Sequence, residues 1–466
     1  MVLATLLSAC TVGPDYQPPE TPTPETWKPL LPETQGGAAD DTADLAAWWR
    51  HFDDPLLESL IERALTVNPD LHSARARVRE ARAARVQVNA ALFPTVQATL
   101  GRTQNRASDT TGRTRESHSY RSGFDVAWEI DLFGGTRRAN EAADADLEAV
   151  RADMQAVRVS LAAEVALEYI DLRRLQEQLD IARHNLETQA DTAQIAQWRS
   201  MAGLSSALDA EQARTAREQT RARIPSIETA LAQTRHRLAT LLAEPSPAAL
   251  AELIPRKPIP LPQWRLAVGI PADMLRRRPD VQAAERRLAA TTARIGSATA
   301  ARFPTLSLSG TLGLQADTLG GLDAHGSSIW SLGSALAATL LDAGRLRSEV
   351  DIRTARQEQA LAAWESTVLG AFEETANALA ALDGSHRAYA ALGDAAAAAG
   401  TAATLARAQY EAGLVDFATL LLAERTRLDA ESALAAARAD AAGSMIQLYK
   451  SLGGGWDPSA DTTDSG

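Results

Sequence analysis

The chain has 466 residues and a formal net charge of −12, and it is rich in Ala, Leu, Arg and Glu, which favour long helices. The acidic balance argues against nucleic acid as a partner, and the single cysteine excludes a disulfide within the chain. No run of 18 apolar residues exists, so no transmembrane helix is predicted.

The first ten residues resemble the end of a bacterial lipoprotein signal. Residues 1–9 are mostly apolar and end in small residues, and Cys10 follows them directly. In a lipobox this cysteine is acylated, so we expect a covalent lipid on Cys10 and interpret residues 1–9 as a signal-peptide remnant. The basic segment of such a signal is missing, which predicts a translation start further upstream. By the same resemblance, Thr11 in place of Asp indicates the outer membrane. A short apolar N-terminus with an unmodified cysteine is the alternative.

Residues 10–68 are predicted to form a lipidated arm and a docking segment. Residues 14–32 are rich in proline, so this stretch is predicted to run extended over a surface. Trp48-Trp49 and Phe52 are predicted to dock the arm onto the body. A short amphipathic helix is predicted at 56–65.

The rest of the chain is two copies of one plan, residues 69–245 and 271–453, offset by 210 positions. Pro69-Asp70 matches Pro279-Asp280, and Phe93-Pro94 matches Phe303-Pro304. A duplication without insertions implies that every element length is constrained, loops included. A Pro-rich bridge at 246–270 joins the copies, and residues 454–466 are predicted to be a flexible tail.

Each copy is predicted to begin with a helix, at 69–92 and 279–302, that ends at a Phe-Pro pair. Two segments with period-two alternation follow in each copy. Of the four segments, the first begins at Thr95, and the other three cover 123–132, 305–315 and 330–340. Their length of about ten residues suits a strand that crosses a membrane. The segments 102–119 and 317–328 are polar and are predicted to be loops.

A long helix is predicted at 136–202, where Gly and Pro are absent and apolar residues follow a heptad pattern. At 1.5 Å per residue such a helix would be roughly 100 Å long, which a globular domain does not need. A return helix is predicted at 205–243, with a kink at Pro225. The second copy repeats this plan, but its long helix is predicted to be softened by four glycines: Gly370, Gly384, Gly393 and Gly400.

Four membrane-type strands cannot close a barrel, and open sheet edges are not tolerated in lipid. Several chains must therefore share one barrel, with 8, 12 or 16 strands for two, three or four copies. One strand face carries Asp125, Glu129 and Asp131, which predicts that this face lines a wet lumen. A soluble sandwich with the three acids in water is the alternative that the strand pattern leaves open.

Three segments resemble outer-membrane efflux lipoproteins of the TolC/OprM (NodT-type) outer membrane factor family. They are Cys10-Thr11-Val12-Gly13-Pro14-Asp15-Tyr16, residues 271–281, and Tyr410-Glu411-Ala412-Gly413-Leu414-Val415-Asp416. The resemblance covers essentially the whole chain and implies an α+β membrane protein. It implies a homotrimer with a 12-stranded β-barrel, an equatorial belt and a long periplasmic α-helical barrel. It also implies two partners, a periplasmic adaptor (membrane fusion protein) and an inner-membrane pump, often of the resistance-nodulation-division (RND) class.

Gly203-Leu204 and Gly413-Leu414 fall where each long helix must reverse. The glycines are predicted to be turn residues with positive φ. By the resemblance, these two turns form the periplasmic tip, where the adaptor docks and the pore closes.

The residue that narrows the aperture in relatives is acidic, whereas the matching position here is Leu422. Leu420 or Leu422 is therefore predicted to form an apolar constriction that gates by dewetting. Polar side chains that could hold the tip shut are Asp209, Asp416, Glu424 and Arg425, with a solvated helix face as the alternative.

Two groups of arginines suggest anionic contacts. The run Arg276 to Arg278 is interpreted as surface charge before a helix, with an anionic partner as the alternative. In the first outer loop, Arg102, Arg106, Arg113 and Arg115 could contact lipopolysaccharide phosphates, although an ordinary solvated loop is the simpler interpretation.

Together these features predict a trimeric outer-membrane channel lipoprotein, extending into the periplasm, that conducts small molecules passively while a pump supplies the energy. The alternatives are the outer channel of a type I protein secretion system and a periplasmic coiled-coil scaffold lipoprotein. The seven histidines lack metal-ligand spacing, and Gly453-Gly454-Gly455 follows a helix rather than a strand. We therefore expect no enzyme activity, no metal and no cofactor besides the lipid.

Overall fold

The computed structural model describes residues 11–20, 45–108, 112, 114–262, 277–323 and 327–457. Cys10, the predicted signal remnant at 1–9, Arg113 and Arg276 lie outside the described residues. The chain divides into two compact units. The strand unit comprises Met1–Thr21, Ala76–Ala152 and Gln282–Thr367, and the hairpin unit comprises Pro22–Arg75, Asp153–Val281 and Val368–Gly466.

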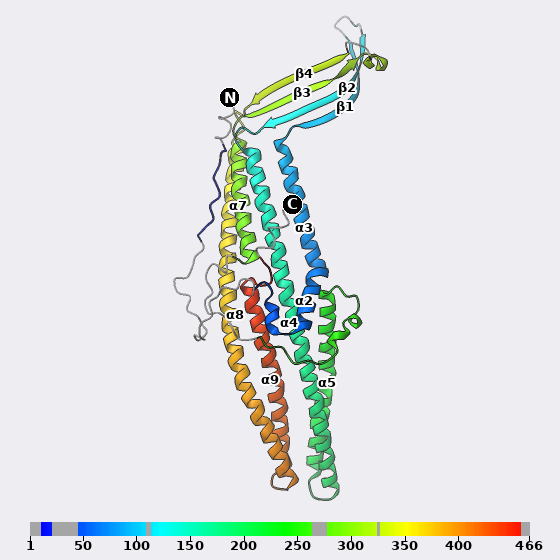
Figure 1. Ribbon diagram of the computed structural model, residues 1–466, viewed down its shortest axis with the longest axis vertical. Coiled ribbons are helices and arrows are strands. Elements are labelled where there is room, and N and C mark those ends of the chain that lie inside the picture. Colours follow the sequence, from blue (N-terminus) through cyan, green and yellow to red (C-terminus); the bar gives the residue numbers. More distant parts are fainter. Residues whose placement is uncertain are drawn as a thin grey trace. The chain divides into compact units, whose positions relative to one another are not determined.

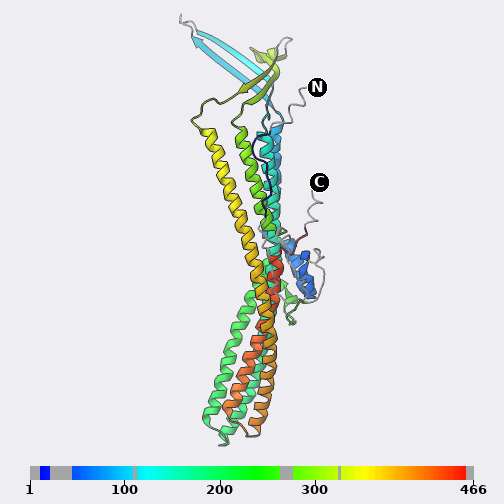
Figure 2. The same cartoon turned by 90° about the vertical axis from the view of Figure 1, so that its left-hand side faces the viewer.

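The strand unit holds one antiparallel sheet in the order β1-β2-β3-β4 (Figure 1). Its strands are β1 (Thr95–Ser108), β2 (Thr114–Ile130), β3 (Thr305–Ala316) and β4 (Ser328–Ala337). Helices join the sheet at one end only, and the β1–β2 hairpin turns at the other end (Figures 1 and 2). Because β1 and β4 are the outer strands, both have an edge that no described strand of this chain covers.

The two faces of this sheet differ in polarity. Residues that pair directly across antiparallel strands share a face, and Val126 pairs with both Val96 and Gly310. The exposed large apolar residues Val96, Leu100, Phe124, Val126, Leu312, Leu314, Trp330, Leu332 and Leu336 all lie on this one face. The opposite face carries Asp125 with Thr99, Thr311 and Arg121 around it. The predicted alternation is therefore real, and it separates an apolar face from a polar one.

The prediction of a loop at 102–119 is wrong for most of its length. β1 and β2 stay paired from Arg102↔Tyr120 to Ser108↔Thr114, whereas the pairing of β2 with β3 ends at Tyr120↔Ala316. The hairpin therefore continues beyond the sheet as a two-stranded ribbon. Polar residues on both faces of this ribbon remove the period-two signal, although the backbone pairing persists.

The helices of the two predicted copies occur in the same order. The first copy has α3 (Pro69–Asn89), α4 (Gly135–Met201) and α5 (Ala207–Leu241), and the second has α7 (Pro279–Ala300), α8 (Arg345–Glu411) and α9 (Phe417–Ser451). The start positions differ by 210 in every pair, since 279−69, 345−135 and 417−207 all equal 210. Helix α8 runs without a break through all four of its glycines, each of which faces open space. None of the described helices is apolar over a stretch long enough to cross a membrane.

The core of the hairpin unit gathers around two tryptophans. The 3-10 helix η1 (Trp48–Phe52) and helix α2 (Pro55–Val67) pack on α4, α5 and α9. Trp48 is fully buried and stacks on Tyr449, and its ring centroid lies 5.7 Å from that of Trp49 and 5.4 Å from that of Tyr449. The predicted docking by Trp48, Trp49 and Phe52 is confirmed, since all three are buried.

The start of the predicted flexible tail is part of this core. Residues 454–456 are buried, the Gly455 N–H donates to Leu45 O at 2.8 Å, and Arg158 Nε donates to Gly455 O at 3.0 Å. The tail prediction is therefore wrong for these residues. A Cβ at Gly454 would lie 3.1 Å from Trp48 Cδ1, so the glycine lets the chain pass close to the indole.

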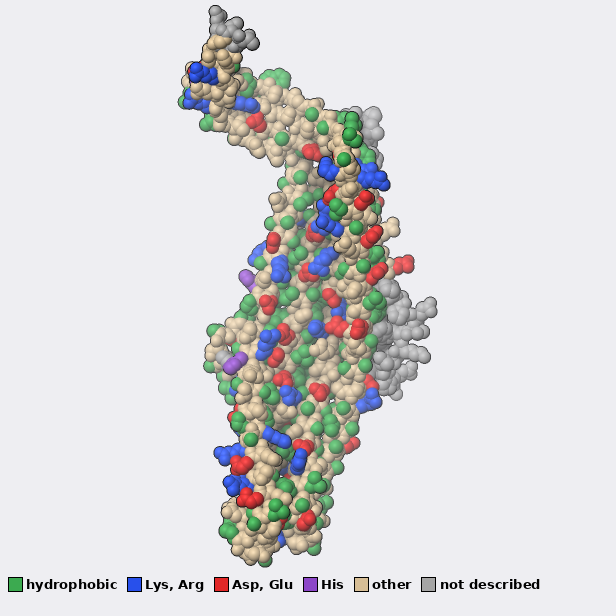
Figure 3. Space-filling view, turned by 180° about the vertical axis from the view of Figure 1, so that it is seen from behind, with side chains coloured by type: hydrophobic (Ala, Val, Ile, Leu, Met, Phe, Trp, Pro, Cys, Tyr) green, Lys and Arg blue, Asp and Glu red, His purple; other side chains and the backbone are tan. Residues whose placement is uncertain are grey.

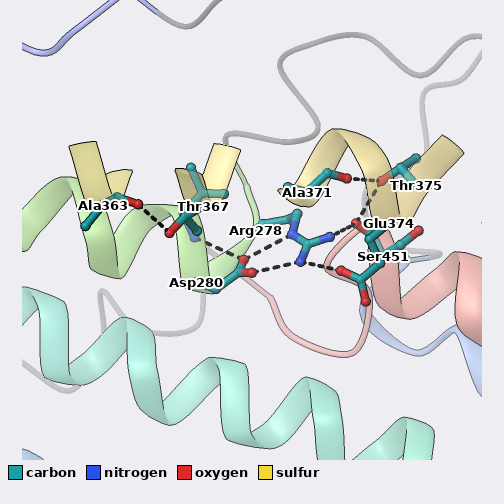
Figure 4. A network of polar contacts seen from close by, with 9 residues as sticks. Arg278, Asp280, Ala363, Thr367, Ala371, Glu374, Thr375 and Ser451 are labelled. Atoms are coloured by element: carbon teal, nitrogen blue, oxygen red, sulfur yellow. Dashed lines mark hydrogen bonds and ion pairs between the residues drawn. The ribbon is translucent and has the colours of Figure 1, made fainter. Parts of the chain in front are cut away.

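Arg278 is buried, which corrects its interpretation as surface charge. Its guanidinium donates to Asp280, Glu374 and Ser451 O at 2.7 to 3.1 Å, and so joins α7, α8 and the end of α9 (Figure 4). Burial disfavours the charged form of Arg278, but the two carboxylates outweigh it and raise its pKa. The matching position in the first copy is Asn68, whose side chain donates to Leu241 O at 3.0 Å. Both copies therefore cap the end of the return helix from the same position.

The described part of the arm, residues 11–20, belongs to the strand unit. The Val12 N–H donates to Phe133 O, Arg138 Nη2 donates to Asp15 at 2.5 Å, and Tyr16 OH donates to Glu285 at 3.1 Å. These contacts hold the residues just after Cys10 near the end of β2 and the start of α4.

Candidate functional site

The two helical hairpins of the hairpin unit end in the same backbone motif. Gly203 and Gly413 have φ values of +72° and +73°. Leu204 N–H donates back to Arg199 O at 2.8 Å, and Leu414 N–H donates to Gln409 O at 2.9 Å. These are Schellman caps, in which glycine adopts the left-handed conformation that closes a helix. The predicted turn role of both glycines is confirmed.

Each return helix begins with an acidic cap. Asp209 forms a capping box with Ser206, and the Asp416 carboxylate accepts from Thr419 N at 2.9 Å and Thr419 Oγ1 at 2.6 Å. Within this chain the carboxylates of Asp209 and Asp416 are held by their own first turns, and a role in holding the tip shut stays a prediction. The hydrogen bonds to Thr419 lower the pKa of Asp416.

The leucines after the two glycines are exposed. Leu204 is 71% exposed and Leu414 is 75% exposed. An apolar side chain in this position normally packs back onto its own helix. Two such leucines at equivalent turns leave an apolar spot at the end of each hairpin.

The two leucines predicted to form a constriction have opposite environments. Leu420 is 2% exposed and packs with Tyr410, Phe417 and Ala196, so its side chain holds helices together. The prediction that Leu420 lines the pore is therefore wrong. Leu422 is 66% exposed. The apolar constriction prediction therefore falls on Leu422 alone.

Three contacts between hairpins were not foreseen from the sequence. Thr192 Oγ1 on α4 donates to Glu424 on α9 at 2.9 Å, and Arg427 Nη2 donates to Asn185 Oδ1 at 3.1 Å. The Arg199 guanidinium lies over the Tyr410 ring, 4.9 Å from its centroid. The partners lie 232, 242 and 211 residues apart in the three pairs, so the periodicity of each helix gives no signal for their pairing.

Glu424 is a buried acid with an incomplete set of partners. It is 4% exposed, and among the described residues no group donates to its Oε2. Burial raises the pKa of Glu424, and the hydrogen bond from Thr192 with the charges of Arg407 and Arg427 only partly offsets this. Glu424 therefore does tie α9 to α4, as a buried contact rather than as part of a solvated face. Arg425, by contrast, is exposed, and its nearest acid is Asp429 at 3.9 Å.

The three acids predicted to line a lumen are not equivalent. Asp125 is held on the polar sheet face by Arg121, Thr99 and Thr311 at 2.8 to 3.0 Å. Glu129 is exposed. Asp131 lies beyond the end of β2 and accepts from the Arg137 backbone N–H at 2.9 Å. The prediction that Asp131 is a strand residue is therefore wrong, because Asp131 caps the start of α4.

Within the described ranges, His, Cys, Asp and Glu form no group that could hold a metal ion. The chain instead offers a membrane-type sheet in one unit and long helical hairpins in the other, which are the parts of an outer-membrane channel component. The comparisons agree with this class. The family described as "Outer membrane efflux protein" matches residues 60–244 and 270–454, and these segments are again offset by 210. The chain belongs to this family, which is a transport family of the outer membrane and not an enzyme family.

Several relatives cover nearly the whole chain. The pyoverdine export outer membrane protein OpmQ of Pseudomonas aeruginosa is 32% identical over 460 residues, 97% of this chain and 95% of that protein. The toluene efflux pump outer membrane protein TtgC of Pseudomonas putida is 34% identical over 464 residues, 98% and 94% of the two chains. The solved structure of the outer-membrane channel OprN is 38% identical, with a TM-score of 0.87 over 96% of this chain and 100% of that one.

Proposed function

We propose that three copies of this chain share one 12-stranded β-barrel in the outer membrane. The observation that carries the proposal is the sheet itself, which has an exposed apolar face, a polar opposite face and two edges that no described strand covers. In lipid, unpaired edge amides cost several kcal/mol each, so β1 of one copy must pair with β4 of the next. The apolar face then meets lipid, and Asp125 faces the lumen.

The helical hairpins continue the channel into the periplasm and end at its gate. The exposed Leu204 and Leu414 give a periplasmic adaptor an apolar contact at each hairpin end. Leu422 narrows the closed pore, and the ties from Thr192, Asn185 and Arg199 hold the hairpins of one chain together.

The channel conducts small molecules passively, and an inner-membrane pump of the RND class supplies the energy through the adaptor. The names of two relatives refer to pyoverdine and toluene, which supports small molecules rather than secreted proteins as cargo. A lipid on Cys10 anchors the chain in addition to the barrel. The contacts of residues 12–16 with the strand unit support this, because they keep the arm close to the barrel.

Native mass spectrometry and single-channel recording test the proposal together. The full 466-residue chain has a mass of 49.7 kDa. The purified protein in mild detergent is expected at three times the mass of the chain that begins at Cys10, plus the mass of its lipid, and it is expected to conduct in planar bilayers. A monomer that stays soluble without detergent and never conducts would favour the scaffold. Co-purification with an ABC exporter in place of an RND pump would favour type I secretion.

A further inference from the structure

The β1–β2 ribbon carries arginines on the same face as the apolar band. On this face Leu100 is 80% exposed and is the last apolar residue of β1. The next residues of β1 on the same face are Arg102, Gln104 and Arg106, which pair with Tyr120, His118 and Glu116 of β2. The apolar face thus changes to a basic one within a single step of the pleat.

The height of the apolar band places this change at a membrane boundary. Ten residues separate Ile130 from Tyr120 along β2, which is about 33 Å of strand and roughly 25 Å across a bilayer for a strand tilted by about 40°. That is the height of the apolar band of outer-membrane barrels. Since helices join the sheet only at the Ile130 end, Arg102 and Arg106 lie at the outer-leaflet side. This step rests on the proposed function.

The side chains at this boundary are arranged to meet phosphate. The Arg102 guanidinium lies over the Tyr120 ring, 5.7 Å from its centroid, and Gln104 Oε1 accepts from Arg102 Nη2 at 3.5 Å. Arg106 is 70% exposed, and its nearest acid, Glu116, is 3.5 Å away, which is a weak surface ion pair. Both guanidinium groups therefore keep donors free for the bidentate geometry that phosphate oxygens accept.

The basic side chains stand out in a chain of net charge −12. Arginine side chains are present at the end of the sheet away from the helices, and other basic side chains are scattered over the rest of this face (Figure 3). The four described arginines of β1 and β2 divide between the two faces: Arg121 is bound to Asp125 on the polar face, and Arg115 pairs with Ala107 on that same face. Of these four, only Arg102 and Arg106 face the lipid side, about 13 Å apart at four strand residues.

We propose that Arg102 and Arg106 bind the phosphate groups of a phosphorylated glycolipid of the outer leaflet. Strand pairing places the backbone of both arginines just beyond the apolar band, with Tyr120 beside Arg102 as an interfacial aromatic residue. Their spacing suits two phosphates rather than one. The site would bind lipid around the barrel and would not contact the transported molecule.

Lipid titration by native mass spectrometry tests the site on the intact, detergent-purified protein. The probes are bisphosphorylated lipid A, the same lipid after phosphatase treatment, and inorganic phosphate. The variants are R102Q/R106Q and the matched control R115Q, which removes an exposed arginine from the other face of the same ribbon. We expect bisphosphorylated lipid A to bind the wild type and R115Q equally, and the double variant roughly tenfold or more weakly. Inorganic phosphate at the same concentration should not displace it.

The inference is overturned if the double variant binds as well as the wild type, if R115Q loses as much binding, or if dephosphorylated lipid binds equally. Displacement by inorganic phosphate would also overturn it, because the site would then be a simple anion site. The same spectra report the oligomeric mass. A trimer that conducts but shows none of these lipid differences refutes the site alone, whereas a monomer refutes the proposed function and the site with it.

Discussion

Glycine at position 13 allows two backbones of the strand unit to touch. Gly13 has φ of +96°, and a Cβ there would overlap Gly296 Cα on α7. We expect Gly13→Ala to release residues 11–16 from their contacts with Phe133 and Arg138, because the methyl group adds a backbone clash to an unfavourable φ. Hydrogen exchange of the Val12 amide, bonded to Phe133 O at 3.2 Å, measures the release.

Gly112→Ala is the control for this substitution. Gly112 has a similar φ of +79°, but a Cβ added there would meet no atom of the described residues within 4 Å. It therefore reports the cost of the backbone conformation alone, about 1 kcal/mol. Equal protection of Val12 in the wild type and in Gly13→Ala would contradict the packing argument.

Arg278 is the residue whose loss should damage the hairpin unit most. Arg278→Ala leaves Asp280, Glu374 and the Ser451 carbonyl without their shared donor. Because the carboxylates of Asp280 and Glu374 are 42% and 41% exposed, loss of their shared donor should cost about 1.5–3 kcal/mol in the free energy of unfolding, less than for a fully buried ion pair. The thermal midpoint of Arg278→Ala should fall well below that of Arg277→Ala, since Arg277 is exposed. Equal midpoints would show that the network contributes nothing.

The pH dependence of this difference has a defined sign. Burial raises the pKa of Asp280, but the hydrogen bond and charge of Arg278 outweigh it, so the pKa is lowered from 3.8. A lowered pKa gives stability that is present above pH 3.8 and is lost as the pH falls through the folded-state pKa. The gap between the wild type and Arg278→Ala should therefore narrow below pH 3.8.

The sequence could not predict which individual side chains of the site are buried. Leu420 and Leu422 are two positions apart in one apolar run, and nothing in that run tells which of them faces the helix partners. Arg278 reads as one of three consecutive arginines, and its burial depends on Glu374 and Ser451, which lie 96 and 173 residues away. These outcomes are set by tertiary packing, which a single sequence does not encode locally.

At the level of elements, the sequence predicted much more. Helix bounds agree with the structure to within about two or three residues, because Phe-Pro pairs and glycines mark their ends and the periodicity fills the interior. The ribbon of β1 and β2 was missed for a physical reason. A strand with both faces polar has no alternation, so only its backbone pairing, seen in the register, defines it.

The contact between α4 and α9 at Glu424 should respond to pH. Burial raises the pKa of Glu424 above its ordinary value of 4.5. A raised pKa means that the stability of this contact is complete below pH 4.5 and is lost as the pH rises through the folded-state pKa. Glu424→Gln cannot ionise and keeps an acceptor for Thr192, so its thermal midpoint should vary less between about pH 5 and pH 8 than that of the wild type.

Glu187→Gln is the matched control, since Glu187 is exposed on α4. It should keep the pH dependence of the wild type. The groups that face Glu424 are Thr192 from α4, Arg407 from α8 and Arg427 from α9. A Glu424→Gln variant with unchanged pH dependence would therefore exclude Glu424 as the titrating group.

At the scale of the whole molecule, the duplication of the chain does not complete its sheet. Each copy supplies two strands and one helical hairpin, and two copies supply a sheet that still has two open edges among the described strands. The equal spacing of 210 residues in every helix pair means that the hairpins of the two copies have equal lengths. Equal lengths are what a closed ring of hairpins requires, because a hairpin of different length would leave the ring open at its end.

The trimer proposed above predicts how the hairpin ends would act as a gate. If the hairpin ends converge in the closed trimer, the exposed Leu422 of each chain forms one apolar ring that excludes water. Leu422→Ala widens that ring and should raise the conductance of the closed channel in planar bilayers. Leu405→Ala, which removes a leucine that is 57% exposed elsewhere on α8, should leave it unchanged.

Leu420→Ala separates gating from stability. Leu420 is buried, so its truncation should cost about 2–5 kcal/mol in the free energy of unfolding through the cavity it leaves. A constriction at Leu422 predicts that conductance rises in Leu422→Ala while its thermal midpoint stays near that of the wild type. If conductance rises only in Leu420→Ala, the pore is closed by packing between helices and not by an apolar ring, because loosening the core would then be what opens it.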